Sequence, residues 1–368
     1  MSSPTPQDGA ARQVSPKSKS ASPRQPGSPH DETGLLPPEH WAALPEEDND
    51  RGDAESTISD NASSTGSLSS SILEYRTIHG RSYHSNRGNA DYWGPIDETS
   101  QEAMDITHQV LTLLMGDKLY LAPIPENIQA AVDIGTGTGI WAIEFADMFP
   151  NASVVGTDLA PIQPSWVPPN LEFQIDDCTQ EWTFQPESLD YVHIRWMLGS
   201  IMDWTALFQQ AYKALKPGGY IESFEPSSCF ESDDGTVVEG GPLDQWGRFF
   251  REGGRKIGRP FTVYEDGIQE EAMGQAGFVE IEERVFKNPV GGWPKDPKLR
   301  SIGQYMQAAI NQDAKGSVIQ MATLLGWTEP EVTVFVSHLR REISSPKIHS
   351  YFKQRAVWGR KPDVAQAD

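Results

Sequence analysis

A glycine-rich segment next to acidic residues holds the clearest chemistry in this sequence. It reads Asp133-Ile134-Gly135-Thr136-Gly137-Thr138-Gly139 and follows a short apolar run. Three glycines at alternate positions allow backbone angles closed to other residues and leave no Cβ on one side of the turn, so a ligand can lie against bare peptide. A second acid, Asp158, ends the apolar run that starts at Val154. Two strand ends that carry acids beside such a loop predict a nucleotide-type site.

Two ligands compete for this loop, a dinucleotide and S-adenosylmethionine. A dinucleotide loop has the spacing G-x-G-x-x-G, whose third glycine lets helix and strand approach while the pyrophosphate meets the helix N-terminus. Here Ile140 holds that position and the third glycine is Gly139. The spacing G-x-G-x-G, with Asp133 two residues ahead, suits a ligand without pyrophosphate whose sulfonium, amino group and ribose attract acids. Asp158 fits both ligands, because an acid at the end of a second strand accepts hydrogen bonds from ribose hydroxyls.

The residues after the next predicted strand decide between the two ligands. Asp177 can accept a hydrogen bond from an adenine amine, and Cys178 offers its backbone N–H to the ring. A turn at 216–219, Lys-Pro-Gly-Gly, follows at the distance expected before a fifth strand. Glycines that merely turn the chain explain one of these four features but not all of them, so we predict that the loop binds S-adenosylmethionine. The predicted donor-binding residues are Asp133, Gly135, Thr136, Gly137, Gly139, Asp158, Leu159, Asp176, Asp177 and Cys178.

Strands alternate with helices around the loop, which predicts an α/β fold with a parallel sheet and helices on both faces. The first part of this pattern comprises strands at 129–134, 154–158, 171–175, 189–195 and 220–224, with helices at 140–148 and 205–215. After an acidic, glycine-rich insertion at 226–264, the second part comprises a helix at 265–275, an edge strand at 277–286, helices at 299–311 and from Thr328, and a last strand at 351–357. Glu331 follows Thr328 at the spacing of a capping box.

The first 70 residues differ in composition from the rest of the chain. Ser, Pro, Gly, Asp and Glu dominate this stretch, which therefore cannot bury enough surface to offset its ordering entropy. We predict a disordered tail at 1–70, a helical cap at 71–125, the donor-binding domain at 126–362 and a flexible end at 363–368. Repeated Ser-Pro steps and basic residues suggest a phosphorylatable tail with a nuclear-import patch, but four scattered cations favour a merely solvated tail.

Composition excludes several classes of protein. A formal net charge of −22 argues against direct nucleic-acid binding, which demands clustered Lys and Arg. Two cysteines are too few for a disulfide framework, and no Cys/His cluster has metal-ligand spacing, so we predict no metal. Neither an apolar run of about 18 residues nor a signal peptide is present. We therefore expect a soluble protein of the cytoplasm, the nucleus or both, without a membrane partner.

With these residues in place, the sequence resembles the fungal LaeA-like family of class I S-adenosylmethionine-dependent methyltransferases over about residues 72–362. The segments that carry the resemblance are VDIGTGTGIWAI (132–143), GTDLAPIQPSWVPPN (156–170), FQIDD (173–177), HIR (193–195), GSIMDW (199–204), DDGT (233–236) and WPKD (293–296). The resemblance implies a class I Rossmann-like, seven-stranded sheet with its last strand antiparallel, and a role in fungal secondary metabolism. The chain departs from the family at 92–99, a segment expected over the active site, which leaves the acceptor open.

Methyl transfer is an in-line displacement from an activated sulfonium, so the enzyme has mainly to align donor and acceptor and to exclude water. If the acceptor must lose a proton, His193 is the candidate base, because it ends the strand at 189–195 and imidazole titrates near neutral pH. The alternative is that His193 packs in the strand and Arg195 pairs with an acid. Weaker candidates are Tyr83, His84 and Glu225. Aromatic residues suited to an acceptor pocket are Trp196, Trp204, Trp246 and Phe250.

Three functions follow from the sequence and the resemblance. The first is an enzyme that methylates a small-molecule natural-product intermediate. The second is a regulatory methyltransferase that acts with a protein partner, as family members working with velvet-type proteins do. The third, a degenerate binding module, is the weakest because no donor-site acid or glycine is missing. The sequence leaves the oligomeric state open.

Overall fold

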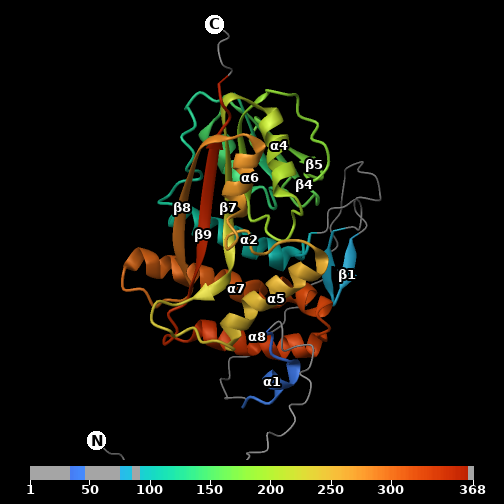
Figure 1. Cartoon of the computed structure of the whole chain (residues 1–368), viewed down its shortest axis with the longest axis vertical. Helices are drawn as coiled ribbons and strands as arrows, with labels where there is room; N and C mark the ends of the chain where they lie inside the picture. The colour runs from blue at the N-terminus through green and yellow to red at the C-terminus, as the bar shows by residue number, and fades with distance from the viewer. Residues whose placement is uncertain (1–33, 46–74, 85–91, 364–368) are drawn as a thin grey trace, which may run out of the picture.

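A seven-stranded sheet forms the centre of the computed structural model, which describes residues 34–45, 75–84 and 92–363 (Figure 1). Its strand order is β5-β4-β3-β6-β7-β9-β8. The strands are β3 (Ala130–Ile134), β4 (Ser153–Asp158), β5 (Leu171–Ile175), β6 (Leu189–Arg195), β7 (Leu215–Glu231), β8 (Val279–Pro289) and β9 (Tyr351–Arg360). Strands β3 to β7 pair in parallel, whereas β9 lies antiparallel between β7 and β8. The predicted sheet, with its antiparallel last strand, is confirmed.

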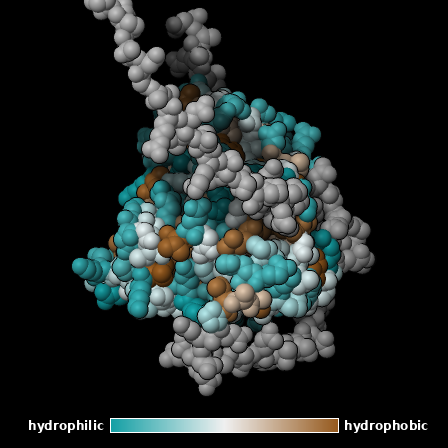
Figure 2. All heavy atoms as spheres, turned by 60° about the horizontal axis from the view of Figure 1, so that its bottom comes forward, coloured by the Kyte–Doolittle hydropathy of each residue, from teal (hydrophilic) through white to brown (hydrophobic). Residues whose placement is uncertain are grey.

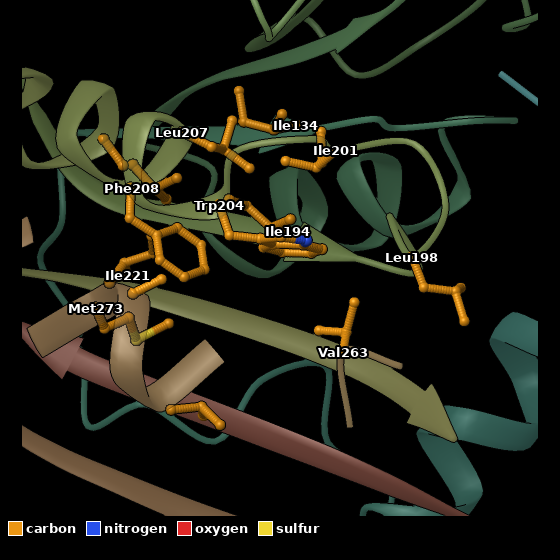
Figure 3. Close-up of a cluster of buried hydrophobic side chains, with 14 of the residues drawn as sticks. Ile134, Ile194, Leu198, Ile201, Trp204, Leu207, Phe208, Ile221, Val263 and Met273 are labelled. Atoms are coloured by element: carbon orange, nitrogen blue, oxygen red, sulfur yellow. The ribbon is translucent and has the colours of Figure 1, made fainter. Parts of the chain in front are cut away.

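Helices cover both faces of this sheet. On one face lies α3 (Ile140–Met148), whose Trp141 and Phe145 pack against Tyr191. On the other lie α4 (Trp204–Ala214) and α6 (Ile268–Ala276), which enclose the cluster of Figure 3 between themselves and the sheet. Trp204 is part of this cluster and is buried in it. Its predicted place in an acceptor pocket is therefore wrong.

A second layer of helices lies beyond the carboxyl ends of the strands, below the sheet in Figure 1. It consists of α2 (Glu98–Leu114), α5 (Pro242–Ile257), α7 (Pro297–Leu324) and α8 (Glu329–Ser344). The helical cap predicted at 71–125 is thus only part of this layer, most of which comes from later in the chain. Helix α8 begins as predicted, since the Glu331 carboxylate accepts from the Thr328 N–H at 2.7 Å. Figure 2 shows hydrophobic side chains of one face only in small groups among hydrophilic ones.

One arginine, Arg81, links two helices of this layer through ion pairs. Arg81 lies on β2 (Arg81–Tyr83), which forms a hairpin with β1 (Arg76–Ile78). Its guanidinium lies 2.6 Å from the carboxylate of Asp97, the N-cap of α2, and 2.6 Å from that of Asp313, where α7 is kinked. A Cβ at Gly316 would lie 2.3 Å from Arg81 Nη1, so a glycine is needed where the guanidinium meets α7. This contact fixes the relative position of α2 and α7.

A short helix, α1 (Pro38–Ala42), lies on the outer side of α8. Trp41 is buried at 1% exposure, meets Phe335 edge-on, and accepts at its carbonyl a hydrogen bond from His338 Nε2 at 3.1 Å. The prediction of disorder across 1–70 is therefore wrong for residues 34–45. The rest of that predicted tail, 1–33 and 46–70, lies outside the described residues, as does 364–368. Among the helices of the described segments, none has the length and apolar character needed to cross a membrane.

Because Trp41 is buried and Trp166 is 90% exposed, the same substitution at both sites separates anchoring from general effects. We expect Trp41→Ala to lower the free energy of unfolding by about 3 kcal/mol. Trp166→Ala should change it by less than about 0.5 kcal/mol. Urea unfolding of both variants checks this. Equal effects at the two sites would show that α1 does not stabilise the helical layer.

Candidate functional site

A cavity of about 310 Å³ lies between the carboxyl edge of the sheet and the helical layer. One side of it is formed by the glycine loop after β3 and by the residues that follow β4, β5 and β6. The opposite side is formed by residues of the 92–96 segment and of helices α2, α5 and α7. In open α/β sheets, ligands bind in the crevice outside the carboxyl ends of the strands. The cavity occupies that crevice, and the helices line the side opposite the strand ends.

The glycine loop takes the left-handed backbone that its sequence predicts, with φ of 70°, 58° and 81° at Gly135, Gly137 and Gly139. The three glycines serve different contacts. A Cβ at Gly135 would lie 2.3 Å from Met197 Sδ, and one at Gly139 would lie 2.3 Å from Phe173 Cζ. At Gly137 the nearest atom would be 3.6 Å away. Gly137 is therefore the position that offers open backbone to a ligand, whereas its neighbours are glycine because side chains pack against them.

Asp158 ends β4 beside this open backbone and lines the cavity. Its carboxylate accepts hydrogen bonds from the N–H groups of Gly137 at 2.8 Å and Ala160 at 3.0 Å. Burial raises the pKa of Asp158 to about 6, because loss of water disfavours the charged form more than the nearby backbone N–H groups favour it. Leu159 and Thr136 line the same part of the cavity. The predicted loop residues and the β4 acid are thus brought together.

The acids after β5 are placed differently from the prediction. Asp176 and Cys178 line the cavity, whereas Asp177 does not. The Asp177 carboxylate accepts from the backbone N–H of Thr179 at 2.9 Å and from its hydroxyl at 2.7 Å. The prediction that the Asp177 side chain faces the donor is therefore not supported, and Asp176 stands in its place.

Asp133 and His193 form a buried pair beneath the loop, outside the cavity lining. His193 Nδ1 lies 2.7 Å from the Asp133 carboxylate, and the imidazole stacks on Trp141 with ring centroids 3.7 Å apart. The other Asp133 oxygen accepts from the Thr136 hydroxyl at 2.7 Å. Burial lowers the pKa of His193 despite the nearby carboxylate. His193 is therefore not placed to act as a base on a bound acceptor, and Asp133 positions the loop instead of lining the cavity.

The turn after β6 is held by another predicted candidate, Glu225. Its carboxylate accepts from the backbone N–H groups of Met197 and Leu198, both at 2.9 Å, and burial raises the pKa of Glu225 to about 8. This turn gives Trp196 a left-handed backbone, with φ of 58°, and Trp196 lines the cavity. Glu225 thus shapes the cavity wall without lining it.

Some of the remaining candidate residues line the cavity and others do not. Trp246 and Phe250, predicted for an acceptor pocket, line the cavity, and so does His84, one of the weaker candidate bases; Tyr83 is buried away from it. The sequence interpretation missed cavity-lining residues on helices, namely Met104, His108, Met306 and Asp313, and Arg195 at the end of β6. The sequence predicted a helical cap at 71–125 and part of α7, but helical spacing does not reveal which face of a helix meets a cavity formed by a distant strand edge. Across the described segments, no three acid, histidine or cysteine side chains gather as metal ligands do.

Comparison with known proteins decides the family. Residues 106–279 match the family described as a methyltransferase domain. The chain is 38% identical to the methyltransferase pytC of Aspergillus terreus over 82% of this chain and 93% of that protein. It is 34% identical to the secondary metabolism regulator LAE1 of Cochliobolus heterostrophus, over 77% of this chain and 94% of that protein. The chain belongs to the fungal LaeA-like family of S-adenosylmethionine-dependent methyltransferases.

A further member of this family, the probable methyltransferase tdiE of Emericella nidulans, is 33% identical over 73% of this chain and 83% of that protein. The chain is thus a methyltransferase of fungal secondary metabolism, and its methyl donor is S-adenosylmethionine. The cavity fits such a donor, because open backbone at Gly137 lies beside two acids, Asp158 and Asp176. When bound, the donor supplies a methyl group on an already activated sulfonium.

The close packing at Gly139 predicts a specific response to alanine. Gly139→Ala adds a Cβ at φ of 81° that would lie 2.3 Å from Phe173, whereas Gly258→Ala adds one at φ of 70° with no atom within 4 Å. A left-handed alanine costs about 1 to 2 kcal/mol in either case. We expect Gly139→Ala to cost about 1 to 3 kcal/mol more than Gly258→Ala, because overpacking adds to the backbone strain.

Urea unfolding measures this difference, and calorimetry with S-adenosylhomocysteine should show weaker binding for Gly139→Ala alone. Equal stability of the two variants, with equal ligand affinity, would contradict the proposed role of Phe173 in shaping the loop.

Proposed function

We propose that the protein transfers the methyl group of S-adenosylmethionine to a small-molecule natural-product acceptor bound in the helical half of the cavity. The observation that carries this proposal is the continuity of one cavity from the glycine loop to helices α5 and α7. A donor on the loop and an acceptor under the helices would then lie in the same cavity. A shared cavity of this kind can hold the two reactants in line for the transfer.

The donor side of the cavity follows the strand order. In this proposal Asp176 after β5 accepts from the adenine amine, and Asp158 at the end of β4 accepts from the ribose hydroxyls. Gly137 provides backbone against which the donor lies. The supporting observations are that these residues line the cavity and that β5, β4 and β3 are neighbours in the sheet. Thr136 and Leu159 complete this side.

The acceptor side is largely aromatic and apolar. Trp196, Trp246 and Phe250 come from the turn after β6 and from α5, and Met306 comes from α7. Aromatic rings bury large area in defined orientations, and methionine adapts to irregular shapes. Such a wall suits a flat or polycyclic molecule more than an extended, charged peptide. Asp313 is the one carboxylate that the helical layer contributes to this wall within the described residues, and it is paired with Arg81. We therefore assign to this side the alignment of the acceptor with the donor, and no base.

A second candidate is a regulatory methyltransferase whose partner or acceptor is a protein, such as a velvet-type regulator. The likeness to LAE1, which is named a secondary metabolism regulator, favours it. The likeness to pytC, named only as a methyltransferase, fits either function. Action on small molecules suits a cytoplasmic protein and action with a transcriptional partner suits a nuclear one, so the compartment belongs to the same proposal.

The two candidate functions differ in the kind of molecule that receives the methyl group, a small molecule or a protein. In the test, the protein is incubated with methyl-labelled S-adenosylmethionine and an extract of a strain of the source organism that lacks this gene. We expect the label to enter the low-molecular-weight fraction of the extract. Asp158→Ala should abolish that label, because the donor loses its ribose acceptor. Mass spectrometry of the small-molecule and protein fractions provides the measurement. Label found only in protein would overturn the small-molecule proposal and support the regulatory one.

Asp158 also predicts how donor binding depends on pH. Because its carboxyl has a raised pKa of about 6, it is mostly protonated at pH 5 and mostly ionised at pH 8. A protonated carboxyl accepts hydrogen bonds poorly, so affinity for S-adenosylhomocysteine should rise about tenfold from pH 5 to pH 8. Calorimetry across this range checks the trend.

Asp158→Asn is the matched control for that titration. It should bind the same ligand weakly and with little change over the same pH range, because the titrating group is gone. A wild-type affinity that stays constant from pH 5 to pH 8 would contradict the assigned contact between Asp158 and the ribose.

A further inference from the structure

Arg195 ends β6 next to the glycine loop and lines the cavity. Ile194 on β6 is paired with Ile134 on β3. Arg195 and Gly135, which directly follow these two isoleucines, therefore lie at the same level at the ends of neighbouring strands. One guanidinium nitrogen, Nη2, lies 3.1 Å from His108 Nδ1. The other, Nη1, is buried and has no hydrogen-bond partner among the residues that the structure describes. Arg195 thus places a cation at the cavity wall, and one nitrogen of its guanidinium has no hydrogen-bond partner within the described segments.

The partner of Nη2 is neutral. Since a guanidinium can only donate, Nδ1 of His108 must accept, which places the ring proton on Nε2. Nε2 lies 3.1 Å from a carboxylate oxygen of Glu144 but does not form a hydrogen bond with it. Burial, with Arg195 nearby, lowers the pKa of His108 to about 3, so the ring stays uncharged. The nearest acids, Asp133 and Glu144, act on Arg195 only across space. An unpaired guanidinium nitrogen in a buried position is costly unless an anion completes it.

The strand order indicates which part of a ligand reaches Arg195. In the proposed donor site the adenine lies at β5 and the ribose at β4, and β3 and β6 follow in the sheet. The donor is a linear molecule whose methionine extends from the ribose, away from the adenine. Its amino-acid end therefore lies over the ends of β3 and β6. The only anionic group at that end is the methionine carboxylate.

We propose that Arg195 binds the carboxylate of the donor's methionine, with His108 as the residue that positions the guanidinium. The planar fork of arginine matches the two oxygens of a carboxylate. The other arginine that lines the cavity, Arg259, donates to the Ser200 carbonyl at 2.6 Å. This inference rests on the proposed donor site and adds a contact to it that neither the glycine motif nor the acids predict.

The test compares two ligands that differ by the carboxylate alone, S-adenosylhomocysteine and its decarboxylated analogue. We expect the wild-type protein to bind S-adenosylhomocysteine at least on the order of tenfold more tightly by calorimetry, as a charge-assisted contact requires. Arg195→Gln should remove this preference while its affinity for the decarboxylated analogue changes less than about threefold. Arg255→Gln, which removes a charge from a side chain that is 73% exposed, should keep the wild-type preference.

Two results overturn the inference. The first is equal affinity of the wild-type protein for the two ligands. This result needs no variant, so it decides the question even if Arg195→Gln does not fold. The second is a folded Arg195→Gln, as judged by its circular dichroism melting curve, that keeps the wild-type preference. If neither ligand binds the wild-type protein, the donor site itself is wrong, which is distinct from a site that binds both ligands equally.

Discussion

The buried pair of Asp133 and His193 is the contact on which the donor side of the molecule depends. It joins the two central strands, β3 and β6, directly under the glycine loop, and Asp133 also holds the hydroxyl of Thr136. A buried carboxylate without such partners would be strongly destabilising. With them, the loop starts from a fixed point, Gly137 is left open to a ligand, and the end of β6 lies beside the loop. The acid and the histidine thus serve the reaction by shaping the site rather than by touching the reactants.

A second contact positions the helices that line the site. Arg81 holds the N-terminus of α2 and the kink of α7 together, and so fixes two helices that line the cavity opposite the sheet. The hairpin that carries Arg81 is short, but its guanidinium is bound by Asp97 and Asp313, which raises the pKa of Arg81 above its ordinary value despite partial burial. In the proposed function, the donor side is formed mainly by residues at the ends of the parallel strands, and the acceptor side mainly by helices together with Trp196 from the turn after β6.

Local patterns predicted the glycine loop, the strands and the fold well, because period-two and helical spacing are properties of short segments. Side-chain placement was less predictable. The sequence identified His193 as chemically able, but only the packing of β6 beside β3 shows that Asp133 and Trp141 enclose it. Past the end of β5 a shift of one residue decides between Asp176 and Asp177, since successive side chains at a strand end face opposite ways. Trp41 was missed because a single aromatic residue in a polar stretch gives no periodic signal.

In the proposed function, the cavity between sheet and helices binds S-adenosylmethionine along the ends of β5, β4 and β3. A crystal structure of the protein with S-adenosylhomocysteine would show where the donor binds. We expect the ligand in this cavity, with its adenine amine at Asp176 and its ribose hydroxyls at the Asp158 carboxylate. A ligand bound elsewhere, or in this cavity with its adenosine turned toward the helices and Asp158 still bonded only to backbone N–H groups, would contradict it.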